Sequence, residues 1–415
     1  MALTVTGAVL DGETVGVRCE EGRIAAIGAE VVAAPGDETI AAAGAPLVAP
    51  LLNGHTHAAM TLFRGSGGDL PLMPWLRERI WPVEARLEAE DVYWGARLAC
   101  AEMTRTGTTR FWDMYWHPEA TARAVADAGL SATIGAPLFD HDGDPAGMRE
   151  RALASLDHLG ELGPAIAPAL APHSIYTVSE ASLRWIAELS AERELPVHIH
   201  LSETEAEVTE CVAAHGLRPA AYLDRLGMLS ERTVLAHGVW LDREELELIA
   251  ARGATVVTNP AANMKLAVGG VFPYPAARSA GVAVGLGSDG AGSNDSLDLL
   301  ADLKLFSLAQ KHAAADATAV AAVEAWEVAT GARAPLLRDG GKPLSVGAAA
   351  DFLLLDPHSP DLAIGELASN LVYAVSGAAV DTTVAGGRVL MRGGELPERA
   401  EIVARAAERA RRLNA

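Results

Sequence analysis

Residues 46–57 read PLVAPLLNGHTH, an apolar run that ends in Asn53, His55 and His57. Apolar runs of this length that alternate with helical patterns are typical of buried parallel strands. Eight such repeats predict an α/β fold, a closed (β/α)8 or TIM barrel, over residues 50–344. The seven further runs are TTRFWDM (108–114), SATIGAP (131–137), AIAPALAPHS (165–174), LPVHIHLSE (195–203), RTVLAHGV (232–239), ATVVTNP (254–260) and VAVGLGSDG (282–290).

The stretches between these runs have helical periodicity. In SEASLRWIAELSAER (179–193), apolar residues fall on one face and Ser179 is placed to cap the start. DREELELIAARG (242–253) opens with Asp242 as a cap and closes with Gly253, a typical residue after a helix end.

Both ends of the chain are rich in short strand patterns. Residues 3–10, 15–20 and 23–28 form one group, and residues 350–356, 382–387 and 388–394 form the other. Neither end is long enough to bury a core alone, so we expect residues 1–49 and 345–396 to form one small β-sandwich. A helical tail is expected in residues 397–415, from Pro397 to Leu413.

The charge of the chain narrows its possible partners. Asp and Glu total 54 against 33 Lys and Arg, a net charge of -21. This balance argues against binding to nucleic acid or to an anionic membrane. Three scattered cysteines give no disulfide framework, and no signal peptide or membrane-spanning run is evident. We therefore expect a cytoplasmic protein.

Rare polar residues fall at the ends of the predicted strands. In a barrel, the carboxyl ends of all strands meet at one mouth, where active sites are built. Beyond His55 and His57, the residues at these ends are His173, His198, His200, Glu203, His237 and Asp289.

The spacing of His55 and His57 indicates a metal site. Residues two apart in a strand share a face, so both imidazoles can reach one cation. His200 and Asp289 can complete a shell of three histidines and one carboxylate around zinc or another divalent ion. His198 is one layer deeper than His200, and we interpret it as a core or supporting residue.

The lysines of the chain bear on the number of metal ions. Barrel hydrolases with two metals commonly bridge them through a lysine on the fourth strand, whereas the first lysine here is Lys265, after the seventh. A single ion is therefore predicted. Glu203, beside it, would move a proton from water to the substrate's ring nitrogen, while His237 and Asp289 orient the attacking group.

Several motifs together resemble the 5-methylthioadenosine/S-adenosylhomocysteine deaminases, a branch of the chlorohydrolase-like amidohydrolases. The resemblance covers the barrel and the β-rich ends, and it implies a metal-dependent hydrolase that removes the amino group of adenine nucleosides. The motifs are NGHTHAAMTLFRGSGGDLPLMPWLRERIWPVEARL (53–87), APHSIYTVSE (171–180), VHIHLSETEAEV (197–208), LAHGVWLD (235–242), NPAANMKLA (259–267) and GLGSDGAGSNDSLDLLADLKLFSLAQK (285–311).

The resemblance also implies roles for single residues. His55, His57, His200 and Asp289 match the family's metal ligands, with Zn²⁺ the expected ion. Glu203 matches its proton shuttle, which also contacts the base, and His237 its catalytic histidine. For the substrate, the resemblance implies that His173 hydrogen-bonds the purine and that Glu84 hydrogen-bonds the ribose hydroxyls. It also implies that Trp75 lines the pocket for the base or the 5′ group.

One departure concerns the substituent at the 5′ carbon of the nucleoside. Relatives that accept S-adenosylhomocysteine carry an arginine after the third strand, where this chain has GAPL (135–138). Arg149 or Arg151 could supply a second cation, but residues 139–144 (FDHDGD) are acidic and would repel a carboxylate. Adenosine, 5′-deoxyadenosine and 5′-methylthioadenosine are therefore expected to be better substrates.

Two other functions remain open at this stage. One is hydrolysis of a guanine, pterin or triazine by the same kind of site, and the other is a barrel that serves as a non-catalytic scaffold. Glu84 and the complete set of metal ligands argue against them. We expect a small nucleoside as the partner, no nucleic acid or membrane, and a homo-oligomer.

Overall fold

The computed structural model describes residues 2–66, 69–140, 143–338 and 342–414. Its centre is one sheet of eight strands in sequential order, and every paired neighbour runs parallel. All eight predicted runs lie in this sheet. The strands are β6 (Leu51–Thr56), β7 (Thr108–Met114), β8 (Ser131–Leu138), β9 (Ile166–Pro172), β10 (Val197–Leu201), β11 (Thr233–His237), β12 (Thr255–Thr258) and β13 (Ala283–Leu286).

Polar contacts join the first and last strands and nearly close the barrel. The backbone N–H of Asp289 donates to the carbonyl of His55 over 3.0 Å. The Asn53 side chain accepts from the Ser288 N–H at 3.0 Å and donates to its Oγ at 2.6 Å. Both residues are fully buried. These contacts place the ends of β6 and β13, and therefore their predicted metal ligands, side by side.

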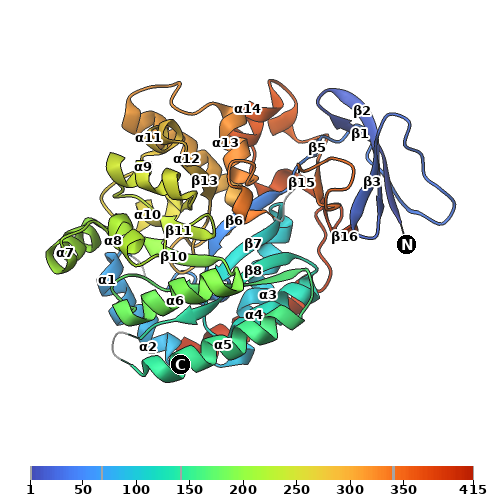
Figure 1. The fold of residues 1–415 in the computed structure, drawn as a ribbon. Coiled ribbons are helices and arrows are strands. Elements are labelled where there is room, and N and C mark those ends of the chain that lie inside the picture. The colour runs from blue at the N-terminus through green and yellow to red at the C-terminus, as the bar shows by residue number, and fades with distance from the viewer. Residues whose placement is uncertain (1, 67–68, 141–142, 339–341, 415) are drawn as a thin grey trace.

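Helices surround the barrel (Figure 1). Two of them begin and end as predicted, because the Ser179 hydroxyl accepts from the Ser182 N–H and Asp242 forms a capping box with Glu245. Gly253 ends the second helix with a φ of 73°. The helices that follow the strands are α3 (Ala89–Arg105), α4 (Pro118–Ala128), α5 (Pro145–Glu161), α6 (Glu180–Arg193), α7 (Glu205–His215), α8 (Pro219–Arg225), α9 (Arg243–Arg252), α10 (Pro260–Lys265), α11 (Tyr274–Ala280), α12 (Leu299–Ala314) and α13 (Ala322–Ala329).

The connection between β6 and α3 is broken into short pieces. It contains η1 (Ala58–Phe63), α1 (Leu72–Trp75), η2 (Leu76–Ile80) and α2 (Trp81–Glu84), and η2 is a π-helical turn. Such turns are rare and occur frequently at functional sites. This segment carries Glu84 and Trp75.

The two ends of the chain form two four-stranded sheets beside the barrel (Figure 1). One has the order β3-β2-β1-β4 and the other β16-β15-β14-β5. Val5, Val17, Phe352 and Val384 share one buried cluster, so the sheets pack on a common core as expected. The strands are β1 (Leu3–Leu10), β2 (Glu13–Glu20), β3 (Arg23–Gly28), β4 (Glu38–Ala41), β5 (Leu47–Val48), β14 (Phe352–Leu355), β15 (Val380–Ala385) and β16 (Arg388–Met391).

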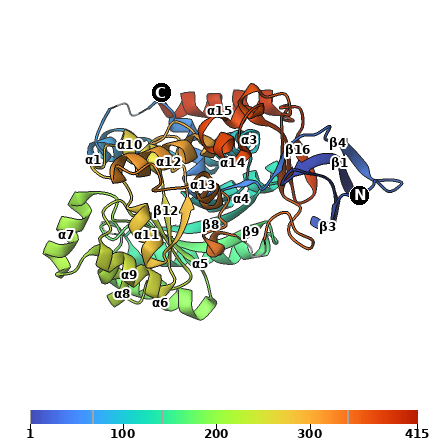
Figure 2. The same ribbon diagram turned by 90° about the horizontal axis from the view of Figure 1, so that it is seen from above.

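One short helix, η3 (Pro335–Leu337), lies between the barrel and β14. Three more, η4 (Pro360–Leu362), α14 (Leu367–Tyr373) and η5 (Gly377–Ala379), lie between β14 and β15. The expected C-terminal helix is present as α15 (Arg399–Asn414), which lies beside α3 (Figure 2). Among the described residues, no helix is both long and apolar enough to span a bilayer. The division of the chain into separate domains at residues 49/50, 344/345 and 396/397 stays a prediction.

Replacing Asn53 by Ala tests whether the seam between β6 and β13 contributes to stability. The change leaves the Ser288 N–H buried without its acceptor, so the free energy of unfolding should fall by about 1–3 kcal/mol in urea titrations. Asn370→Ala is the matched control, because its amide makes one exposed hydrogen bond to the Ile364 carbonyl. Equal stability of both variants would contradict a role for the seam.

Candidate active site

Four side chains that were predicted as metal ligands converge at the carboxyl ends of the strands. Asp289 Oδ1 lies 3.4 Å from His55 Nε2 and 3.3 Å from His57 Nε2. His57 Nε2 lies 3.2 Å from His200 Nε2. The ligand atoms of the three histidines all lie within 4.8 Å of one another, and so do those of His55, His237 and Asp289. One small volume is therefore surrounded by imidazole nitrogens and a carboxylate.

Backbone carbonyls fix the orientation of two of these imidazoles. His57 Nδ1 lies 2.6 Å from the Met114 carbonyl, and His200 Nδ1 lies 2.6 Å from the His173 carbonyl. A carbonyl oxygen only accepts, so each Nδ1 carries the hydrogen and each Nε2 keeps its lone pair. Such contacts are the usual way in which a protein orients a metal-binding histidine.

His198 lies behind His55 rather than at the centre of the cluster. Its Nε2 is 2.9 Å from His55 Nδ1, and its ring packs edge-on against Trp112. With the hydrogen on His55 Nδ1, His198 accepts it and directs His55 Nε2 toward the cluster. This geometry agrees with the supporting role interpreted from the sequence.

The residues present fit a divalent cation. His55 Nε2 is buried and has no hydrogen-bond partner among the described residues. Burial lowers the pKa of His55 to about 3 and holds the pKa of His200 well below its usual value, so both imidazoles are neutral, the form that binds metal. Burial by itself raises the pKa of Asp289, but the contact with His55 and the neighbouring imidazoles lower this pKa by more. The Asp289 side chain therefore stays ionised.

Asp113, at the end of β7, supports the turn that follows the His55–His57 pair. Its Oδ1 accepts from the Thr56 hydroxyl at 2.9 Å and from the Ala58 N–H at 2.6 Å. Burial raises the pKa of Asp113 to about 6, against the effect of these hydrogen bonds. The sequence reasoning did not identify this residue, although it is a carboxylate at a strand end.

Glu203 lies directly beyond β10 and beside His237. Its Oε1 is 3.8 Å from His237 Nδ1. Burial raises the pKa of Glu203, and the charge of Asp289 adds to this rise, while His237 opposes it. A carboxyl group with a raised pKa can both accept and release a proton near neutral pH.

Glu207 holds the backbone that carries Glu203. The N–H groups of Ser202 and Glu203 both donate to the Glu207 carboxylate, each over 2.9 Å. The Glu207 N–H in turn donates to the hydroxyl of Thr204, which caps α7. Glu207 was missed from the sequence, although Thr204-x-x-Glu207 has the spacing of a capping box.

His237 is held by two asparagines of the segment after β12. Its Nδ1 lies 2.8 Å from Asn263 Oδ1 and 3.3 Å from Asn259 Nδ2. Burial lowers the pKa of His237, but the carboxylates of Glu203 and Asp289 raise it by more. With Nδ1 bound to the Asn263 oxygen, Nε2 is the atom free to act. Asn263 is another residue that the sequence reasoning did not identify.

The backbone is strained at three of these strand ends. Ser202, His237 and Asp289 have φ values of 51°, 76° and 61°, in the left-handed region. Each such residue costs about 1–3 kcal/mol unless it is glycine. At each of these positions the left-handed φ accompanies a change of chain direction at or just after the end of a strand.

Glu84 is held near the cluster by a tyrosine that follows β7. The Tyr115 hydroxyl donates to Glu84 Oε1 at 2.8 Å, and the Tyr115 ring lies 6.0 Å from that of His57. Burial raises the pKa of Glu84, and the bond from Tyr115 partly opposes the rise. Tyr115 was not identified from the sequence.

The other two predicted substrate contacts lie in different surroundings. The His173 ring is 4.7 Å from that of His200 and is half-buried, with Nδ1 3.0 Å from the Thr177 hydroxyl. Trp75 is buried in an apolar cluster with Met60 and Phe63. Its ring lies beside Gly292, in the loop after β13.

An aromatic residue, Phe139, directly follows β8, where the arginine of relatives that accept S-adenosylhomocysteine is absent. The ring of Phe139 lies 5.5 Å from His173, 6.4 Å from Trp116 and 6.3 Å from Trp81. A side chain larger than hydrogen at position 135 would meet Ala171, since a Cβ there would lie 2.4 Å from the Ala171 Cβ.

The charged residues near β8 face helix α6. Asp140 accepts from the Ser179 N–H at 2.6 Å and from its hydroxyl at 2.9 Å. Arg149 donates to the Ser182 hydroxyl at 3.1 Å and lies over the Trp185 ring. The carboxylate of Asp140 therefore caps the start of α6, and the expected repulsion of a ligand carboxylate stays a prediction. Residues 141 and 142 of the acidic stretch lie outside the described residues.

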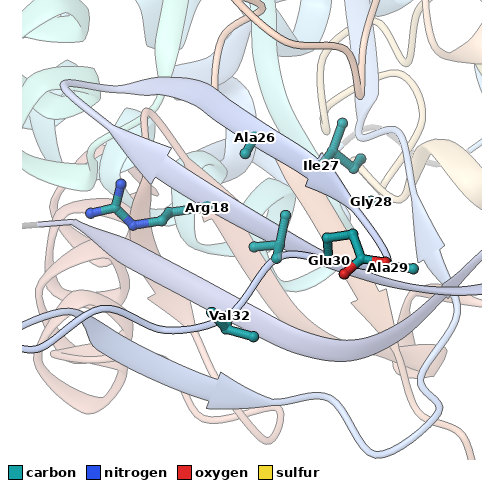
Figure 3. A pocket seen from close by; sticks show the side chains of 8 residues that line it. Arg18, Ala26, Ile27, Gly28, Ala29, Glu30 and Val32 are labelled. Carbon is teal, nitrogen blue, oxygen red and sulfur yellow. The ribbon is translucent and has the colours of Figure 1, made fainter.

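A separate shallow hollow lies on the N-terminal sheet (Figure 3). It is lined by Arg18 and by residues 26–32. The Arg18 guanidinium already pairs with Asp37 and Glu20. Because these contacts neutralise the cation, we assign no chemistry to this hollow.

A nearly closed (β/α)8 barrel with histidines and an aspartate gathered at its strand ends is the architecture of a metal-dependent hydrolase. Residues 47–390 match the Amidohydrolase family, and the chain belongs to this family.

The chain aligns with named relatives over most of its length. It is 48% identical to the 5′-deoxyadenosine deaminase of Methanoregula boonei over 89% of this chain and 85% of that one. It is 39% identical to 5-methylthioadenosine/S-adenosylhomocysteine deaminase 1 of Archaeoglobus fulgidus, over 96% and 94%. A crystal structure of an adenosine deaminase from Xanthomonas campestris with bound zinc superposes with a TM-score of 0.93 at 34% identity, covering 100% and 98% of the two chains.

Proposed function

We propose that this protein is a hydrolytic deaminase of adenine nucleosides that uses one Zn²⁺ ion. The observation that carries the proposal is the convergence of His55, His57, His200 and Asp289 beside Glu203. The names of the relatives, which are deaminases of 5′-deoxyadenosine and related nucleosides, support the same substrate class.

The metal site fits a single ion. His55, His57, His200 and Asp289 would hold it, and β9 carries no lysine that could bridge to a second. When bound, a divalent ion supplies the Lewis acidity that makes water nucleophilic near neutral pH.

Glu203 is the proton carrier in the proposed reaction. Its carboxylate takes a proton from the attacking water and delivers it to the purine ring nitrogen next to the amino-bearing carbon. His237, through Nε2, and Asp289 orient the water toward that carbon. The remaining proton of the added hydroxyl passes to the amino group, the C–N bond breaks as the carbonyl forms, ammonia leaves, and the product is the inosine analogue.

His173 and Glu84 bind the substrate. The imidazole of His173, which is half-buried and lies 4.7 Å from that of His200, would hydrogen-bond the purine. Glu84 keeps acceptor positions beyond its bond with Tyr115, so it can accept protons from the two vicinal ribose hydroxyls. A bare guanine, pterin or triazine offers no such hydroxyls, and a non-catalytic scaffold has no need of the assembled ligand set.

The surroundings of β8 favour an uncharged group at the 5′ position. Trp81, Trp116 and Phe139 offer apolar ring surface there, and Arg149 is turned toward α6. These contacts support 5′-deoxyadenosine, 5′-methylthioadenosine and adenosine as substrates in preference to S-adenosylhomocysteine. A homo-oligomer and a cytoplasmic location stay predictions.

Removing one ligand tests the metal site. His55→Ala should lose both the ion and the activity, because the remaining groups cannot complete the shell, and elemental analysis of the wild type should give one ion per chain. The matched control is His312→Ala, which changes an exposed histidine on α12. Two tightly held ions in the wild type would contradict the single-metal site.

Removing the proton carrier tests the mechanism. Glu203→Gln should keep its metal and fold but lose kcat by roughly a hundredfold or more, the usual scale for a general acid–base group. Steady-state turnover and metal content would be measured together. Glu210→Gln changes an exposed residue of α7 and should behave as wild type. If Glu203→Gln retained most of its kcat, the proton-transfer role would belong to another group.

A comparison of substrates tests the assignment of the 5′ group. kcat/KM for 5′-deoxyadenosine should exceed that for S-adenosylhomocysteine by roughly ten- to a hundredfold, the value of one charge-assisted contact of about 1.5–3 kcal/mol. Glu84→Ala should raise KM for both nucleosides without loss of metal. Glu78→Ala, at an exposed position of the same segment, should leave KM unchanged. Equal turnover of the two nucleosides would show that a cation reaches the homocysteine carboxylate.

A further inference from the structure

The end of the C-terminal helix α15 and the turn after α2 hold each other through two arginines. The Arg412 guanidinium donates to the Arg86 carbonyl at 3.0 Å, and the Arg86 guanidinium donates to the Leu413 carbonyl. Figure 1 shows the C-terminal end of the chain beside α2. Each arginine therefore binds the backbone of the other segment, although the two lie more than 300 positions apart in the sequence.

Arg412 is itself anchored at a buried carboxylate. Its Nε donates to Asp91 Oδ1 at 3.1 Å, and its Nη2 contacts Asp91 Oδ2. Asp91 is fully buried in the first turn of α3, where it also accepts from the Glu88 N–H at 2.8 Å. Two parallel N–H donors on one carboxylate fix the plane of a guanidinium. Arg412 is therefore a rigid bridge from α3 to the turn after α2.

Apolar contacts reinforce this arrangement. Leu413 and Ala406 of α15 are buried in the same cluster as Trp75, Ile80 and Tyr115. Tyr115 is the residue whose hydroxyl bonds Glu84. The helix and Tyr115, which supports Glu84, therefore belong to one apolar cluster.

The turn that contains Glu84 is too short to move independently of Arg86. The N–H groups of Ala85, Arg86 and Leu87 bond to the carbonyls of Trp81, Val83 and Glu84, each at 3.0 Å. A shift of Arg86 therefore moves the backbone of Glu84 through one connected set of hydrogen bonds.

We propose that Arg412 is a positioning residue for Glu84, so that the C-terminal helix sets the geometry of the ribose-binding carboxylate. The inference rests on the proposed role of Glu84 as the residue that binds the ribose diol. Arg412 touches neither substrate nor metal, and it acts by holding the Arg86 carbonyl and the buried Asp91 in one fixed relation.

The first test is Arg412→Ala in the metal-saturated full-length enzyme with 5′-deoxyadenosine as substrate. KM should rise roughly three- to thirtyfold, which lies within the range of coupling energies inside one hydrogen-bonded network, while metal content and kcat stay close to wild type. Arg412→Lys should recover part of the loss, because it keeps the charge beside Asp91 but lacks the second donor. Arg405→Ala is the control, since Arg405 is exposed on the same helix, pairs with Glu408 and lies over the Trp94 ring, away from Asp91 and Arg86.

A double-mutant cycle separates positioning from general destabilisation. In a Glu84→Ala background, Arg412→Ala should change KM by less than about twofold, because the group that it positions is gone. If the effects of Glu84→Ala and Arg412→Ala on KM were independent and multiplied in the double variant, the inference would be overturned. If Glu84→Ala alone left KM unchanged, the proposed ribose role would fail instead, which distinguishes the two failures.

Arg86→Ala provides a second route if Arg412→Ala does not fold. It removes the bond to the Leu413 carbonyl without leaving Asp91 unpaired. It should raise KM in the same direction and show the same loss of effect in the Glu84→Ala background. If a folded Arg86→Ala protein with an unchanged melting temperature had the KM of the wild type, the inference that the contacts between Arg86 and α15 position Glu84 would be overturned.

Discussion

The site depends on the closure of the barrel between β6 and β13. Of the candidate ligands, His55 lies in the first barrel strand and His57 directly follows it, while Asp289 follows the last strand. These segments are more than 220 residues apart, and the bond from the Asp289 N–H to the His55 carbonyl joins them. Asn53 and Ser288 add two buried hydrogen bonds to the same seam. Without closure, the carboxylate would not reach the imidazoles.

Burial then gives each group at the mouth its chemical state. It keeps His55 and His200 neutral, which suits metal binding, and it raises the pKa of Glu203, which suits proton transfer. Asp289 stays ionised because the imidazoles around it outweigh its own burial. One low-dielectric environment therefore produces neutral imidazoles, one ionised carboxylate and one carboxyl group with a raised pKa, according to the neighbours of each group.

The sequence predicted the barrel strands and the metal cluster because both leave a local signal. An apolar run that ends in a histidine can be recognised without knowledge of its partners, as for His55, His200 and His237. Tyr115 and Asn263 were missed because their roles arise from contacts with residues distant in the chain, Glu84 and His237. The side chain of Asp140 illustrates the same limit, since its charge was apparent but its partners on α6 were not.

The two halves of the proposed site differ in how they are held. The metal cluster is built on barrel strands and on strained strand ends, where a small displacement breaks several contacts at once. Glu84 instead lies in a chain of short turns, and helical segments of four or five residues are unstable alone in water. Such a segment takes its geometry from whatever packs against it, here Tyr115 on one side and α15 on the other. Changes in these outer contacts therefore affect the proposed nucleoside-binding half of the site, while the strands that hold the candidate metal ligands stay the same.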